Sequence, residues 1–155
     1  MTTVVVFHSV LGIRPGLLAA ADRLREAGHQ VTVPDLFEGR VFDDYDEAIA
    51  FQQTVGHPAV LARAMSAVDG VPDGFVSMGF SMGCAPAVYA ATQRPVSGVL
   101  MVAGAIPTSA FELGLTWPAG VPAQIHQTLD DPWREPEMLA EAIREITAAG
   151  AEHEV

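Results

Sequence analysis

The chain has 155 residues, 8 Lys+Arg against 19 Asp+Glu, a formal net charge of −11 and a single Cys. A chain of this length buries roughly 70% of its unfolded surface, enough for one core, so we expect a single domain over residues 1–155. The acidity and the scattered basic residues argue against a nucleic-acid or anionic membrane partner. The apolar run 4–7 is too short for a signal peptide or a membrane span. The lone Cys84 cannot form an internal disulfide, which indicates a cytoplasmic protein.

Short apolar runs alternate with stretches of helical period, which predicts βαβ units in a mostly parallel sheet. The predicted elements are strand 4–7, a helix from Pro15 to Gly28, strand 30–33, helix 45–55, a helix from 58 to 68, strand 74–78, helix 82–93, strands 98–103 and 123–127, and a helix that ends at Gly150. Helix 82–93 is apolar nearly all round, as in a helix buried against a sheet. We therefore expect an α/β fold in which helices flank both faces of the sheet in three layers.

Four acidic residues lie between positions 43 and 47, ahead of helix 45–55. We interpret them as a solvated helix start, capped by Asp43 or Asp44, because carboxylates there favour the helix dipole. A metal site is the weaker interpretation. No Gly-x-Gly-x-x-Gly follows the first strand, so no dinucleotide is predicted and we expect neither a cofactor nor a metal.

The motif Gly79-Phe80-Ser81-Met82-Gly83 stands between a predicted strand and a predicted helix, the context that a nucleophile elbow requires. The sharp turn would hold the Ser81 oxygen clear of the sheet, and the close approach of strand and helix would require glycine at 79 and 83. The alternative is an ordinary tight turn with Ser81 as a helix N-cap.

Two backbone N–H groups are candidates for an oxyanion hole. The Met82 N–H at the helix start is the first, and the Val10 N–H in the loop after the first strand is the second, with Ser9 next. His8, at the end of that strand, is predicted to be a core or edge histidine bonded to the backbone.

An elbow serine needs a histidine base and a carboxylate that orients it, in the chain order Ser, Asp or Glu, His. Asp130 and Asp131 follow the strand 123–127 and suit the acid role, although an acidic turn that caps the next helix is the alternative for Asp130. Only His153 follows Asp131, at the start of a further strand, and a strand of five residues spans about 17 Å, so His153 lies at the edge far from Ser81. None of His29, His57 and His126 is directed at the elbow by its place in the sequence, so the chain lacks a predicted general base.

Together these residues resemble the dienelactone hydrolase family of α/β-hydrolases. The resemblance covers essentially the whole chain and rests on the segments 5–12, 33–39, 79–83 and 121–132. It implies Ser81 as nucleophile, Asp131 as acid, and the Met82 and Val10 amides as oxyanion donors. In this family a final strand leads to a loop that bears the histidine, so we expect a C-terminally incomplete domain that stops at the start of that strand.

The name-giving enzymes use a cysteine nucleophile and a glutamate after the first strand, where this chain has Ser81 and Ser9. We therefore expect a serine esterase or thioesterase that cleaves a small ester or lactone through a Ser81 acyl-enzyme, rather than a dienelactone hydrolase in the strict sense. The alternative is a non-catalytic or truncated domain that binds a small acyl ligand or a partner chain, and an exposed sheet edge would favour a homodimer.

Candidate substrate-binding residues are Ser9, Arg40 and Trp117. Arg40, like Arg14, lies in a loop near the expected pocket, where it would pair with a substrate carboxylate or remain a solvent-exposed arginine. Trp117 would line the pocket or pack on it. Cys84 lies three residues past Ser81 on an apolar helix, and we expect an inert core thiol.

Overall fold

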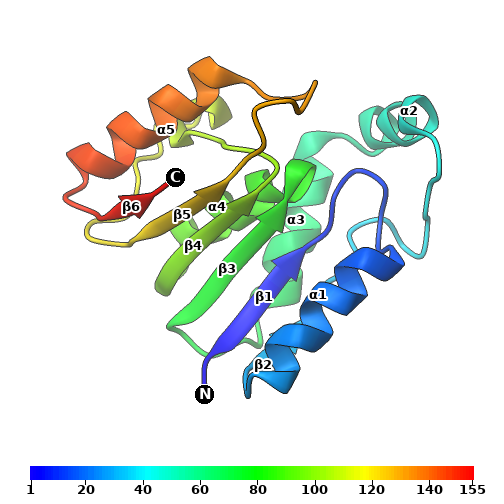
Figure 1. Ribbon diagram of the computed structural model, residues 1–155, viewed down its shortest axis with the longest axis horizontal. Helices are drawn as coiled ribbons and strands as arrows, with labels where there is room; N and C mark the ends of the chain where they lie inside the picture. The colour runs from blue at the N-terminus through cyan, green and yellow to red at the C-terminus, as the bar shows by residue number, and fades with distance from the viewer.

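Six parallel strands form one sheet in the order β2-β1-β3-β4-β5-β6, in a computed structural model that describes residues 1–155 (Figure 1). The strands are β1 (Thr3–Phe7), β2 (Gln30–Thr32), β3 (Phe75–Phe80), β4 (Val96–Val102), β5 (Ala123–His126) and β6 (His153–Glu154). The predicted parallel sheet is confirmed, and β3 continues two residues beyond its predicted end at 78. Its carboxyl end therefore coincides with the start of the Ser81 turn.

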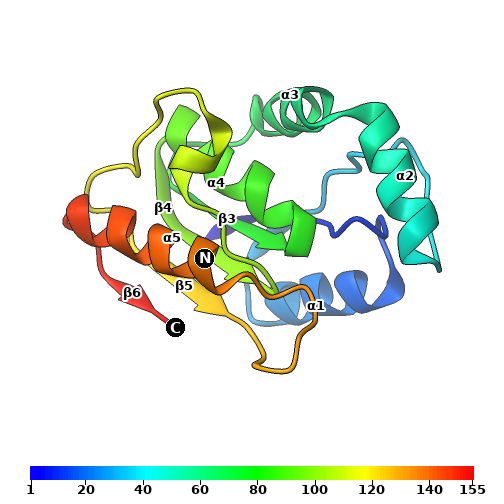
Figure 2. The same ribbon diagram turned by 90° about the horizontal axis from the view of Figure 1, so that it is seen from above.

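Helices cover both faces of this sheet, as predicted (Figure 2). They are α1 (Pro15–Glu26), α2 (Tyr45–Val55), α3 (His57–Val68), α4 (Cys84–Gln93) and α5 (Pro136–Ala148), with two short 3₁₀ turns, η1 (Ser81–Gly83) and η2 (Thr108–Phe111). Asp44 caps α2 by accepting a 2.9 Å hydrogen bond from the Glu47 N–H, which supports the helix-start interpretation of the acidic run. No helix combines the length and the apolar character needed to span a bilayer.

Alternating side chains of the strands build separate cores on the two faces, because successive residues of a strand point to opposite sides. Val5 and Phe7 of β1 pack with α3 and α4, whereas Val4 and Val6 pack with the apolar face of α1. A further cluster joins β4 and β5 to α4 and α5 through Met101. All four of the β1 residues 4–7 are buried, as the run of apolar residues on both faces predicted.

The register of β6 decides where His153 lies. His153 pairs with Ala123, the first residue of β5, and is exposed. The carboxyl end of β5 and the Ser81 turn are therefore at the opposite edge of the sheet, as the sequence predicted for this histidine.

Glu145 fastens α5 to the η2 turn. Its carboxylate accepts hydrogen bonds from the Thr108 N–H (2.5 Å), the Thr108 hydroxyl (2.7 Å) and the Ser109 N–H (3.0 Å). Burial alone would raise the pKa of Glu145, but the hydrogen bonds from Ser109 and Thr108 outweigh it and lower the pKa. The ionised carboxylate thus caps η2 and fixes the segment after β4.

A Glu145→Gln variant should unfold more easily at pH 7, by about 1 kcal/mol, because charge-assisted hydrogen bonds to a partly exposed site are lost. Since folding lowers the pKa, this contribution is complete above the unfolded-state value of about 4.3 and disappears as the pH falls through the lower folded-state value. Urea denaturation at pH 7 and pH 3.5 should show the wild type converging on the variant in acid. Equal stability of the two at pH 7 would contradict this role, and Glu26→Gln on exposed α1 is the matched control.

Candidate active site

The turn from β3 into α4 is a tight backbone crossing that only glycine permits at two positions. Ser81 has φ = 51°, a left-handed conformation that is strained for a residue with a side chain. A Cβ atom on Gly79 would overlap the Gly83 carbonyl, and one on Gly83 would lie 2.6 Å from the His8 carbonyl oxygen and closer still to that of Phe7. The predicted need for glycine at 79 and 83 is confirmed, and the turn rests directly on the end of β1.

Ser81 is exposed and lines a cavity of about 460 Å³ at the carboxyl ends of β1, β3, β4 and β5. Val10, Met82 and Asp131 line the same cavity. The structure therefore brings together the four residues that the sequence predicted as nucleophile, oxyanion donors and acid.

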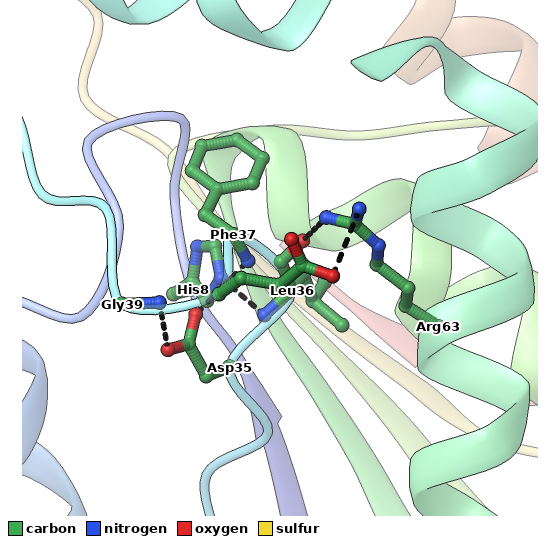
Figure 3. Close-up of polar contacts among 7 residues, drawn as sticks. His8, Asp35, Leu36, Phe37, Gly39 and Arg63 are labelled. Carbon is green, nitrogen blue, oxygen red and sulfur yellow. Dashed lines mark hydrogen bonds and ion pairs between the residues drawn. The ribbon is translucent and has the colours of Figure 1, made fainter.

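The loop that carries Val10 is held by the buried His8 ring, whose contact with Leu36 is shown in Figure 3. The ring Nε2 accepts a hydrogen bond from the Leu36 N–H (2.9 Å), so the ring proton is assigned to Nδ1, which donates to the Ser9 carbonyl (2.7 Å). Burial lowers the pKa of His8, against the opposing effects of the Ser9 carbonyl and the Asp35 charge. His8 is thus a neutral core histidine bonded to the backbone, as predicted.

The loop after β2, which contains Leu36, is itself held by hydrogen bonds with Asp35 and Arg63. Asp35 accepts hydrogen bonds from the Phe37 N–H (2.9 Å) and the Gly39 N–H (2.6 Å), and Arg63 of α3 donates to the Leu36 carbonyl (2.7 Å). Figure 3 shows these side chains converging on the segment that His8 contacts. The segment that carries Val10 is therefore connected through His8 and Leu36 to α3.

Asp131, and not Asp130, reaches the cavity. Asp131 is half-buried and lies in a turn in which its Oδ1 accepts from the Trp133 N–H (2.9 Å), whereas Asp130 is exposed. Trp133 also lines the cavity, and its ring centroid lies 5.8 Å from that of Tyr45 at the start of α2. The two rings connect the loop after β5 to the start of α2, and both line the cavity.

His57 is the histidine that lines this cavity, and the sequence did not predict it. Its Nδ1 lies 3.2 Å from Nε2 of Gln52, which also lines the cavity. The interpretation that nothing directs His57 toward the Ser81 site is therefore wrong, because the packing of α3 beside α4 brings the start of α3 to the cavity wall. No histidine ring hydrogen-bonds to Ser81 or Asp131.

The predicted substrate-binding residues do not line this cavity. Trp117 is only 3% exposed, belongs to the core of β4, β5 and α5, and donates its indole N–H to the Val121 carbonyl (2.8 Å). Of the two positions left open for Trp117, the structure therefore shows packing in the core and not a place in the cavity lining. Arg40 lies over the Phe42 and Phe51 rings, 5.5 and 5.0 Å from their centroids. Ser9 turns its hydroxyl to the Leu11 N–H at 3.3 Å.

Arg14 also points elsewhere, since it pairs with Asp43 at 2.5 Å. No arginine or lysine lines the cavity, and its charged side chains are the carboxylates Asp131 and Glu135. The expected pairing of Arg14 or Arg40 with a substrate carboxylate therefore finds no support. The structure holds no group of three or more His, Cys, Asp or Glu side chains arranged to bind a metal ion.

Cys84 is a core thiol. Burial raises its pKa to about 12, against weaker opposing hydrogen bonds, and its Sγ points to the Gly79 carbonyl (3.4 Å) and the Val102 carbonyl (3.7 Å). It is 2% exposed. The predicted core position of Cys84 is confirmed, and the raised pKa suppresses the thiolate form that would act as a nucleophile.

The dienelactone hydrolase family model matches residues 1–155, the whole chain. The chain belongs to the dienelactone hydrolase family. Solved structures agree in fold: the dienelactone hydrolase-like promiscuous phosphotriesterase P91 from metagenomic libraries superposes with a TM-score of 0.82 at 22% identity, over 100% of this chain and 68% of P91. The protein named m3DLH superposes with a TM-score of 0.80 at 20% identity, over 99% of this chain and 68% of the m3DLH chain.

A more distant structural neighbour is the Vlm2 thioesterase domain bound with a dodecadepsipeptide, with a TM-score of 0.59 at 15% identity, over 99% of this chain and 85% of that domain. Comparison with curated proteins gave no significant match. The fold is thus the α/β-hydrolase fold, and the dienelactone hydrolase family is a family of hydrolases.

A His8→Gln variant should change how stability depends on pH. Because folding lowers the pKa of His8, the unfolded chain takes up a proton below about pH 6.5 while the folded chain does not, so the wild type should lose stability on acidification, by up to about 1.4 kcal/mol per pH unit. Above that pH the ring contributes no slope, and the slope ends where the pH falls below the lower pKa of the folded state. Urea denaturation at pH 7.5, 6.0 and 5.0 should show a flatter profile for His8→Gln.

Two results would speak against this account of His8. One is a variant profile that runs parallel to the wild type between pH 7.5 and 5.0. The other is the same flattening in His126→Gln, which changes an exposed ring on β5 and serves as the matched control.

Proposed function

We propose that this protein is a serine hydrolase that cleaves esters, thioesters or lactones through a Ser81 acyl-enzyme. The observation that carries the proposal is the strained Ser81 conformation (φ = 51°) on a glycine-flanked strand-to-helix turn that opens into a cavity. Backbone strain is kept where surrounding structure enforces it and is concentrated at functional sites. An ordinary N-cap serine would adopt extended backbone and would need neither glycine.

In the proposed reaction the Ser81 Oγ attacks the carbonyl carbon of the substrate, and the carbonyl oxygen becomes an oxyanion. The Met82 N–H at the start of the η1 turn and the Val10 N–H from the loop after β1 are the proposed donors to that oxyanion. Each donor of this kind is worth about 2.7–4 kcal/mol of transition-state stabilisation. The bond to the alcohol or thiol then breaks, and the leaving oxygen or sulfur takes up the proton that Ser81 has lost; in a lactone the alcohol stays attached to the acyl group. Water next attacks the acyl-enzyme, the acid is released, and a proton returns to the Ser81 Oγ.

Asp131 is the proposed carboxylate of the site. It shares the cavity with Ser81 and is held by the turn that ends in its hydrogen bond with the Trp133 N–H. Because no arginine lines the cavity while Asp131 and Glu135 do, a neutral substrate suits the site better than a carboxylate-bearing lactone. The names of two structural neighbours, a phosphotriesterase and a thioesterase, are consistent with ester-type bonds as the target.

A fluorophosphonate probe tests the nucleophile directly. We expect covalent labelling of the wild type at Ser81, no labelling of Ser81→Ala, and unchanged labelling of Cys84→Ala, because the Cys84 thiol is buried and protonated. Peptide mass spectrometry locates the adduct. Equal labelling of the wild type and Ser81→Ala would overturn the proposal, and no labelling of either would favour a domain that binds acyl ligands without chemistry.

The acid is tested by a pair of neighbouring variants. Asp131→Asn should slow labelling and the hydrolysis of p-nitrophenyl butyrate by roughly 10²-fold or more, because a carboxylate that supports proton transfer is lost. Asp130→Asn, which changes the exposed neighbour outside the cavity, is the matched control and should keep wild-type rates. Identical rates in the two variants would remove Asp131 from the mechanism.

A further inference from the structure

A second cavity of about 860 Å³ lies beside the Ser81 cavity, between α3, α4 and the η2 segment. On α4 and the turn before it the lining residues Met82, Ala85 and Tyr89 follow one another along a single face. On α3, Leu61 and Met65 are one helical turn apart. We call this cavity the α3–α4 groove; Figure 2 shows α3 and the segment after β4 near α4.

The groove is continuous with the Ser81 cavity. The two cavities share five lining residues, His57, Met82, Ala85, Ile106 and Met138. One of these, Met82, directly follows Ser81 and carries the proposed oxyanion donor. A substrate whose reacting carbonyl stands at Ser81 can therefore extend into the groove without leaving the protein surface.

The lining of the groove is apolar. Apart from His57 and Tyr89, no lining side chain carries a nitrogen or oxygen atom, and none is an acid or an arginine. The protein has a net charge of −11, so an uncharged cavity of this size next to the proposed nucleophile contrasts with the acidic character of the chain. The Tyr89 ring centroid lies 5.5 Å from that of Phe111, and both residues line the groove.

The length of the groove follows from the helix that forms its floor. From Ser81 to Cys84 the η1 turn advances about 6 Å at 2.0 Å per residue, and from Cys84 to Tyr89 the helix α4 adds about 7.5 Å at 1.5 Å per residue, about 13 Å in all. A zigzag alkyl chain with bonds of about 1.5 Å covers that distance in about ten bonds. Polar or charged groups would lose their hydration there without finding hydrogen-bond partners.

Building on the proposed hydrolase function, we propose that the α3–α4 groove binds an unbranched alkyl chain attached to the reacting carbonyl group, so that the substrate is a medium-chain ester or thioester. The groove then supplies binding free energy that a small lactone cannot use. Full burial of each methylene group would raise kcat/KM about fourfold, an upper limit for an open groove. The chain belongs either to the acyl group or to the alcohol, which two substrate series distinguish.

The experiment measures kcat/KM for p-nitrophenyl butyrate and octanoate, and for ethyl and octyl butyrate. We expect the wild type to prefer the longer member of one series at least tenfold; the series that shows it identifies the acyl or the alcohol side. Met65→Gln keeps the side-chain length but adds an unpaired amide, and should reduce the chain-length preference below threefold, with the loss falling on the longer substrate. Ala110→Trp, at an exposed lining residue, should reduce the same preference by filling the groove.

Leu18→Gln is the matched control, because Leu18 is a partly exposed leucine on α1, outside the lining of either cavity. Binding of the unreactive ketones 2-hexanone and 2-decanone, measured by calorimetry, separates the two proposals. Hydrolysis with no chain-length preference, and equal binding of the ketones, overturns the groove inference and leaves the hydrolase proposal standing. Tighter binding of 2-decanone that Met65→Gln removes, without hydrolysis of any ester, supports the groove as an alkyl-chain site and overturns the hydrolase proposal.

Discussion

The contact between the Gly79–Gly83 turn and the end of β1 leaves no room for even one methyl group on Gly83. This contact forces the chain to pass from β3 into α4 within a few residues, which places Ser81 in a left-handed conformation at the edge of the sheet. It also places the loop after β1 against the start of the helix. The Met82 and Val10 amides consequently come from segments seventy residues apart and still line one cavity.

The contact between the Gly79–Gly83 turn and β1 fixes the position of Val10 only because hydrogen bonds also hold the loop after β1. His8 accepts from the Leu36 N–H on one side and donates to the Ser9 carbonyl on the other, and Arg63 holds the Leu36 carbonyl from α3. A buried imidazole in this place must stay neutral to accept the Leu36 bond. Preorganisation of the Val10 segment therefore depends on a protonation state as well as on packing.

The sheet, the order of the helices and the Ser81 turn could be predicted from the sequence, because buried parallel strands are apolar on both faces and the glycine spacing reflects a local steric requirement. The residues that form the other walls of the cavities could not be predicted from the sequence. His57 and Trp133 reach the Ser81 cavity through the packing of α3 and the path of an irregular loop, neither of which has a periodic signal. For Trp117 the sequence could not decide between the pocket wall and the core, since a large aromatic residue in an irregular segment suits both equally well.

The deep position of Cys84 has a consequence for the conditions in which this protein can work. Cys84 is the only thiol of the chain, and burial raises its pKa to about 12, which suppresses the thiolate that oxidants and electrophiles attack. With an oxygen atom at position 81 instead of sulfur, the reacting atom of the proposed mechanism is also one that peroxide does not readily modify. The proposed nucleophile therefore does not depend on a reduced thiol, whereas a cysteine at the same turn would.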